Sequence, residues 1–381
     1  MNRLTSPVVF LALLLAMVLM PILAHADNVV VGVNLLNAPD KLTPDEQESI
    51  LNAMQAAGVR VIRMGIDVDR NGDEKGINFA ERVYAHGIKI DWLVNLQWPK
   101  GTKAPTPPPG MGLWRNPPLS TSDPDSFRAY FQSMLGKLES KGIVLAGFEL
   151  GNEINFTANA DFPLPGKGKI FGLDDLYHDP EGQQIARGFT QYMKSLAVLK
   201  DIRDHSKLNQ HTPIISAGLA IGNNPPGPSW DKRVDGVAIN ATLEFLRVNG
   251  LDHLVDYYGV HTYPPGNGPG TNQGAANRLS RLENIVFTEC RPAGSSSGKP
   301  CWLTEWGFGA AGNSCPVDDS YRTTLVREVR DDFAQFAQQG RLKAIFYYTW
   351  QGQIHAPKED RFGAFLCGAL TESGRLAISP M

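Results

Sequence analysis

Two stretches of the sequence each place a carboxylate after an apolar run. Residues 148–153 end on Glu153, and residues 302–307 contain Glu305, with aromatic residues nearby in both. A single carboxylate at the end of a strand is more often an ion-pair partner than a catalytic group. Two of them on separate strands predict the pair that hydrolyses glycosidic bonds, in which one protonates the leaving oxygen and the other attacks the anomeric carbon or activates water.

Eight segments have the composition of strands that are buried on both faces. They cover residues 29–34, 59–66, 88–96, 143–152, 213–219, 255–261, 301–306 and 344–350. Amphipathic helical patterns lie between them, and the first opens with a capping box at residues 43–46. Strands that alternate with helices predict a parallel sheet, and eight of them favour a closed α/β barrel, the (β/α)8 or TIM barrel. We expect one catalytic domain over residues 27–381.

The barrel also predicts where the two glutamates point. Glu153 ends the fourth strand and Glu305 the seventh, and alternate residues of a barrel strand face inward. Glu149, Gly151 and Glu153 share one parity, and Leu303 shares its parity with Glu305. Both glutamates are therefore predicted to face the mouth of the barrel, opposite each other.

Four long loops follow strands, at residues 97–123, 155–179, 307–319 and 351–368. They would lie on the C-terminal face, where barrel enzymes build their sites, and they suggest an extended cleft and endo action. A linker between two domains is the alternative for the proline-rich segment 97–123. The final helix is weak, because residues 371–381 are short and contain Gly374 and Pro380. We expect it to be truncated or replaced by irregular chain.

The pair Asn152-Glu153 at the fourth strand and Glu305 at the seventh resemble the two signatures of clan A glycoside hydrolases, which include family 5 cellulases and family 39 enzymes. The resemblance spans most of residues 27–381 through the order and spacing of the strands. Four further positions fit it: Arg63 in the second strand, His261 and Tyr263 in the sixth, and Trp350 in the eighth. One position departs from family 5, because Asn95 and Gln97 stand where its third strand often ends in histidine. The resemblance therefore indicates the clan and leaves the family and the sugar open.

The resemblance implies a reaction that retains the anomeric configuration, with the two carboxyl groups about 5–5.5 Å apart. Glu305 would be the nucleophile, kept ionised with help from Arg63 and Tyr263. Glu153 would donate a proton and then act as base toward water. Asn152 would bind the sugar hydroxyl next to the anomeric carbon.

Each of these side chains also has a structural interpretation. Arg63 could serve only to neutralise Glu149 inside the barrel, since a buried charge needs a partner. Ordinary packing could account for four more predicted substrate contacts: His261, Tyr263, Trp306 and Trp350. Three loop tryptophans could either stack on sugar rings or anchor their loops: Trp98, Trp114 and Trp230. Asn95 and Trp98 complete the predicted substrate contacts.

The N-terminus has the form of a secretory signal peptide. Arg3 precedes an apolar run over residues 8–23, and residues 24–26 read Ala-His-Ala, a cleavage site. An uncleaved anchor is the alternative, although the run is short for a membrane span. We expect residues 1–26 to be removed and the rest to be secreted or periplasmic. The net charge is -3, and the sequence has no run of Lys and Arg that would suit binding to nucleic acid or to a membrane surface.

The four cysteines could pair in three ways. In the barrel, Cys290 and Cys301 fall at the bottom, and Cys315 and Cys367 fall in two loops at the top, so these pairs are favoured. The histidines show no metal-ligand spacing, and no nucleotide or serine-hydrolase motif occurs. We expect a monomer without metal or cofactor that acts on an oligo- or polysaccharide. A non-catalytic carbohydrate-binding barrel and a transglycosylase are the alternatives.

Overall fold

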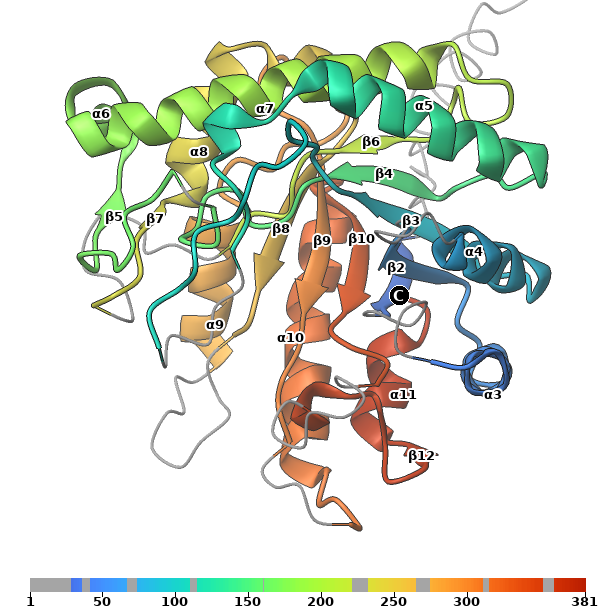
Figure 1. Ribbon diagram of the computed structural model, residues 1–381. Coiled ribbons are helices and arrows are strands. Elements are labelled where there is room, and N and C mark those ends of the chain that lie inside the picture. Colours follow the sequence, from blue (N-terminus) through green and yellow to red (C-terminus); the bar gives the residue numbers. More distant parts are fainter. Residues whose placement is uncertain are drawn as a thin grey trace, which may run out of the picture.

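Eight parallel strands form a single closed barrel in the computed structural model (Figure 1). The structure describes residues 29–35, 42–66, 74–109, 115–159, 161–220, 232–264, 275–310, 315–351 and 360–381. The strands are β1 (Val30–Asn34), β2 (Val61–Gly65), β3 (Lys89–Val94), β4 (Gly147–Leu150), β6 (Ile214–Ile215), β8 (Tyr258–Thr262), β9 (Cys301–Trp306) and β10 (Leu342–Tyr347). Their order is β6-β4-β3-β2-β1-β10-β9-β8, and bridges Ile215–Tyr257 and Leu219–Val260 join the two edges. The predicted TIM barrel is confirmed.

Helices follow the strands and surround the barrel (Figure 1). They are α3 (Pro44–Ala56), α4 (Lys75–Ala85), α5 (Pro124–Ser140), α6 (Leu173–His178), α7 (Pro180–Asp204), α8 (Ile239–Val248), α9 (Ala275–Arg281), α10 (Ser320–Gln338) and α11 (Glu372–Ile378). The capping box is present, because Thr43 and Glu46 each bond the other's backbone N–H at the start of α3. Since β3 and β4 pair directly, segment 97–123 is a loop of one barrel and not a linker.

The last helix is short, as expected. Helix α11 has 7 residues and begins at Thr371, whose hydroxyl accepts a hydrogen bond from the backbone N–H of Gly374 at 3.0 Å. Two small sheets lie outside the barrel: β5 (Ile170–Phe171) with β7 (Gly236–Val237), and β11 (Phe365–Leu366) with β12 (Ala369–Leu370). The first of these sheets joins the loops that follow β4 and β6.

The inside of the barrel has a compact apolar layer beneath a charged one. The apolar layer comes from alternate positions of four strands: Val61, Ile215, Trp302, Ala344 and Phe346. Trp302 and Phe346 lie with ring centroids 5.7 Å apart. A Cβ at Gly32 would lie 2.5 Å from the Phe346 ring, so β1 needs glycine at that point. This layer closes the barrel below the polar side chains that follow toward the C-terminal face.

Two disulfides pin the chain at opposite ends of the barrel. Cys290 is bonded to Cys301, and Cys315 to Cys367, as predicted. The second bond ties the loop after β9 to the loop after β10, on the C-terminal face. Two disulfides fit an extracellular protein. Within the described residues, no helix has both the length and the apolar character that a membrane crossing requires.

Candidate active site

The C-terminal ends of β4 and β9 bring the two predicted glutamates together. Glu153, Glu305 and His261 each offer one ligand atom, and these atoms all lie within 4.8 Å of one another. Retaining glycosidases hold their carboxyl groups about 5–5.5 Å apart, whereas inverting enzymes need about 6.5–9.5 Å to admit a water. One oxygen of Glu153 and one of Glu305 therefore lie within 4.8 Å, which is shorter than the separation that inverting enzymes need.

Glu305 reaches the mouth of the barrel through a β-bulge. The pairing of β8 with β9 shifts by one residue between Leu303 and Glu305. Thr304 faces inward, where its hydroxyl bonds Glu149 at 3.1 Å, while Leu303 belongs to the outer core. Leu303 was expected to face inward together with Glu305, and that premise was wrong. With Leu303 in the outer core, strict alternation would have turned Glu305 outward. The bulge places two successive side chains on the inner face.

Glu153 reaches the site through a turn and not through strand alternation. Strand β4 ends at Leu150, and the chain then adopts positive φ at Gly151 (78°) and at Glu153 (46°). The backbone N–H of Glu153 donates to the carbonyl of Gly218 at 2.8 Å, which holds the turn. A non-glycine residue in the left-handed region is strained, and such strain concentrates at functional sites.

Arg63 connects the site through all five of its N–H donors. Glu149 receives bonds from Nε at 2.6 Å and from Nη2 at 3.0 Å. Nη1 donates to Glu305 at 2.8 Å and to Asn34 at 2.9 Å, and Nη2 donates to Asn152 at 2.8 Å. Arg63 therefore neutralises Glu149 and also bonds Glu305 and Asn152, while its part in the reaction stays a prediction.

Tyr263 and His261 complete the surroundings of the carboxylates. The Tyr263 hydroxyl donates to Glu305 Oε2 at 2.5 Å. His261 Nδ1 lies 3.1 Å from Glu153 Oε1 and 3.6 Å from Glu305 Oε2, so the ring sits between the two acids. A Cβ at Gly218 would lie 2.1 Å from His261 Nε2, and only glycine leaves room for the imidazole.

The charges around Glu305 favour its ionised form. Burial acts to raise the pKa of Glu305, but the positive charges of His261 and Arg63 and the hydrogen bonds from Tyr263 and Arg63 hold it below its ordinary value. Burial acts to lower the pKa of His261, yet the negative charges of Glu305 and Glu153 raise it. An ionised Glu305 is the state that a nucleophile needs.

Replacement of Tyr263 by phenylalanine should slow the reaction and move its pH profile. Loss of a hydrogen bond to a charged group costs about 1.5–3 kcal/mol, so kcat should fall about 10- to 100-fold. The bond lowers the pKa of Glu305. Its removal should therefore move the acidic limb of kcat/KM to higher pH. The matched control is Tyr347→Phe, which removes a hydroxyl bonded to the Phe308 carbonyl and should leave the profile in place.

Asp91 is a buried acid that sequence reasoning missed. It lies inside the barrel on β3, is 0% exposed, and neither carboxyl oxygen has a hydrogen-bond partner within the described part of the chain. Burial, and then the negative charge of Glu149, raise the pKa of Asp91 well above its ordinary value, although Arg63 acts to lower it. The neutral form of Asp91 is therefore favoured beneath the Arg63–Glu149 pair. Its position at the middle of an apolar strand was the only available signal.

Asp91→Asn should stabilise the protein at neutral pH by about 1 kcal/mol or more, because folding favours a protonated Asp91 at a pH where the unfolded chain is ionised, whereas an amide is uncharged in both states. A folded-state pKa above the unfolded one makes Asp91 increasingly costly as pH rises from its ordinary value. The gain should therefore shrink toward pH 4 in urea unfolding experiments. Asp161→Asn is the control, since Asp161 accepts bonds from Ser120 and Gln184 and its change should destabilise. Equal stability of the parent and of Asp91→Asn at pH 7 would contradict the raised pKa of Asp91.

The predicted aromatic contacts divide into two groups. Trp306 packs in the outer core, edge-on to Phe333 of α10 and to Tyr347, and is 0% exposed, so we expect no sugar contact from it. Trp350 is also buried and stacks on Phe365 with centroids 5.5 Å apart. Trp98 is half-buried and lines a hollow together with Asn152. Trp114 and Trp230 lie outside the described residues.

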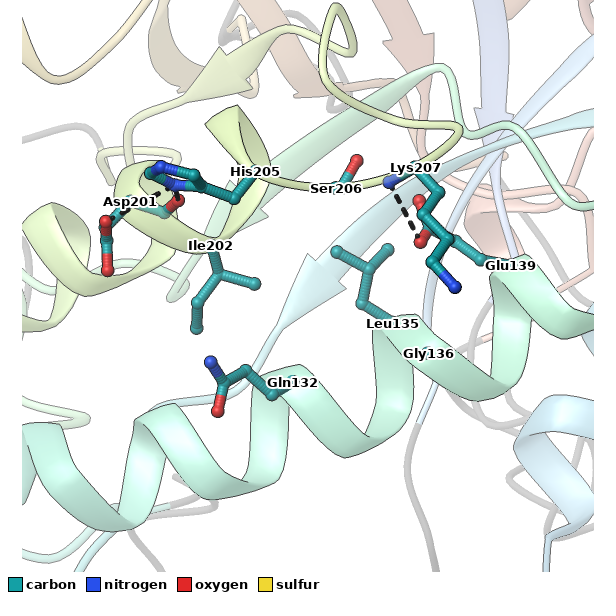
Figure 2. A pocket seen from close by; sticks show the side chains of 9 residues that line it. All are labelled: Gln132, Leu135, Gly136, Glu139, Asp201, Ile202, His205, Ser206 and Lys207. Carbon is teal, nitrogen blue, oxygen red and sulfur yellow. Dashed lines mark hydrogen bonds and ion pairs between the residues drawn. The ribbon is translucent and has the colours of Figure 1, made fainter.

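Hollows in the described part of the molecule include one near the candidate site and one between two outer helices. One, of about 370 Å3, is lined by Asn95, Trp98 and Asn152 beside the candidate site. The other, of about 280 Å3, lies between α5 and α7 (Figure 2). Glu139 in this second hollow accepts backbone N–H bonds from the segment after α7, and His205 pairs with Asp201. These contacts give the second hollow a structural role.

The three grouped ligand atoms of Glu153, His261 and Glu305 are close enough to hold a cation. Both oxygens of Glu305 already accept bonds, from Arg63 and Tyr263. A metal ion would also meet the positive charge of Arg63 at 2.8 Å from the same carboxylate. The residues fit acid–base chemistry better than metal binding, and the expectation of no metal stays a prediction.

No family model and no curated protein matches this sequence. Solved structures are similar over nearly the whole chain. They include a fungal β-1,4-galactanase (18% identity, 91% of this chain and 94% of that chain, TM-score 0.51) and a GH5_18 enzyme of Bifidobacterium longum in complex with Manβ1-4GlcNAc (14%, 92% and 77%, TM-score 0.54). A family 1 β-glucosidase from Thermotoga maritima is similar at 11% identity (92% and 96%, TM-score 0.53). The fold of this chain is thus the barrel fold of clan A glycoside hydrolases, as the resemblance predicted.

Proposed function

We propose that this protein is a retaining glycoside hydrolase that cleaves O-glycosidic bonds of an oligo- or polysaccharide. The observation that carries the proposal is that one oxygen of Glu153 and one of Glu305 lie within 4.8 Å around His261, with Arg63 and Tyr263 bonded to Glu305 and not to Glu153. This asymmetry supports different roles for two otherwise equivalent side chains. The glycosidase activities named for the structural neighbours support the same reaction class.

The reaction proceeds in two displacements. Glu305 attacks the anomeric carbon while Glu153 transfers its proton to the departing glycosidic oxygen, which leaves as an alcohol. Water then attacks the resulting ester at the same carbon, Glu153 takes the proton of that water, and Glu305 departs as a carboxylate. Asn152, held by Arg63, would bind the adjacent sugar hydroxyl where contact strengthens in the transition state.

The cellular setting is part of the proposal. We propose that residues 1–26 are a signal peptide, that the rest is secreted or periplasmic, and that it acts as a monomer. The disulfide across the loops after β9 and β10 supports an oxidising compartment. The long loops support endo action on an extended chain.

Proton NMR of the first-formed product on a panel of aryl glycosides and polysaccharides tests the reaction class. We expect the first product to keep the anomeric configuration of its substrate. Inversion would contradict the proposed roles. Sugar binding without turnover would favour a non-catalytic barrel, and predominant transfer to sugar acceptors would favour a transglycosylase.

A further inference from the structure

A cavity lined by Asn152, the chain neighbour of Glu153, is walled mainly by amides. It has a volume of about 370 Å3, and its polar wall consists of Asn95, Asn116, Asn152 and Asn159, with Trp98. Leu96 and Ile154 complete it as apolar contacts. The wall brings together the ends of β3 and β4 and the loop before α5. We call it the amide cavity. Its volume lies at the lower end of the range for ligand sites, about 300–1,000 Å3, which suits one sugar unit.

Asn159 is a buried part of this wall and links it to the chain at Glu153. The residue is 1% exposed, and its Nδ2 donates to the backbone carbonyl of Glu153 at 3.0 Å. That bond identifies Nδ2 as the donor and leaves Oδ1, which accepts no bond within the described residues. A buried oxygen without a donor costs free energy, so the wall carries a polar group that the described residues do not satisfy.

Two other amides of the wall have hydrogen-bonding groups that are available to a ligand. Asn152 accepts from Arg63 through Oδ1, so its Nδ2 remains to donate. The side chain of Asn116 makes no hydrogen bond in the described part of the chain, where only its backbone N–H is bound, to the Ala158 carbonyl. Trp98 is held through Nε1 at 2.9 Å from the Pro118 carbonyl, which fixes the ring beside the amides. Donors, acceptors and an aromatic ring together match the hydroxyls and C–H faces of a sugar.

The wall is uncharged. None of its described lining residues carries a charge. Arg63, the cation that contacts Asn152, has already committed its five donors to other groups. An anionic group moved into the cavity would lose its hydration without meeting a free cation, which is strongly unfavourable. The cavity should therefore select against acidic sugars.

We propose that the amide cavity is an accessory subsite for one uncharged sugar unit, so that the enzyme selects neutral glycans over uronate-containing ones. The inference rests on the proposed function for its link to catalysis, because Asn159 ties the cavity to the backbone of Glu153. It also narrows the substrate class from any polysaccharide to a neutral one.

Binding measurements on Glu305→Gln protein test the proposal without turnover. The probes are β-1,4-linked galactose, glucose and mannose tetrasaccharides and the same compounds with C6 oxidised to carboxylate. We expect the best neutral tetrasaccharide to bind at least about 10-fold more tightly than its oxidised counterpart, because each lost or unmatched hydrogen bond costs about 0.5–1.5 kcal/mol or more. Equal binding of the two would overturn the subsite.

Two variants of the wall and one control test whether the binding preference arises in the amide cavity. Asn116→Ala should weaken binding of the neutral tetrasaccharide about 10-fold, and Asn116→Lys should reduce or reverse the preference over the oxidised one. Gln132→Ala, in the hollow between α5 and α7, should change neither affinity (Figure 2). Unaltered binding in both Asn116 variants would refute the subsite. Selective neutral binding by a parent protein that hydrolyses no sugar would refute the proposed hydrolase and still support the subsite.

Discussion

Glu305→Gly should lower the turnover of aryl glycosides by about 10⁴-fold or more, because the covalent step loses its nucleophile. Azide should restore part of the rate by entering the space that the side chain vacated. Azide then attacks the anomeric carbon in a single displacement. The product should be a glycosyl azide whose anomeric configuration is opposite to that of the substrate.

The control for this experiment is Glu81→Gln, which removes a surface carboxylate paired with Lys141. Exposed ion pairs contribute little, so its turnover should match that of the parent. Rescue of Glu305→Gly to an azide of unchanged configuration would assign the nucleophile elsewhere. Near-parental turnover without azide would do the same.

Glu153→Ala should respond differently because it removes the proton donor and spares the nucleophile. Loss of general acid–base catalysis should cost about 10²–10⁴-fold on substrates with poor leaving groups. A dinitrophenyl glycoside needs no proton on departure, so it should still form the glycosyl-enzyme and show a burst followed by slow turnover. Azide should then accelerate the second step and yield a product of retained configuration.

The two variants check each other through product stereochemistry. One displacement inverts the anomeric carbon and two displacements retain it, so the variants must give opposite azides from the same substrate. Identical azides from both would contradict the assignment of roles. Equal rate losses of Glu153→Ala on good and poor leaving groups would show that Glu153 is not the proton donor.

The order of elements and the disulfides could be predicted from sequence because each depends on local or topological rules. The capping box at Thr43 is a four-residue pattern, and strands that alternate with helices imply the barrel. Once the barrel is assumed, each cysteine falls at its top or its bottom, which leaves one geometrically possible pairing. The meeting of Glu153 and Glu305 follows from the same topology.

Other features of the site could not be predicted, because they depend on the backbone geometry of single residues, which the sequence pattern does not indicate. The bulge that turns Glu305 inward and the positive φ of Glu153 each interrupt the alternation on which the parity argument relied. Trp306 was predicted to contact substrate, but one position past the bulge it faces α10 instead. Asp91 and Asn159 gain their importance from neighbours far away in sequence. No period or motif signals such neighbours.

The central claim is that Glu305 forms a covalent bond to the sugar while Glu153 protonates the departing glycosidic oxygen. An activated 2-deoxy-2-fluoro glycoside of whichever sugar is hydrolysed fastest should slow both displacements and trap the intermediate on the parent enzyme. Mass spectrometry of the digested protein should find one fluorosugar, attached to Glu305. A sugar attached to Glu153, Glu149 or any other residue would contradict the account.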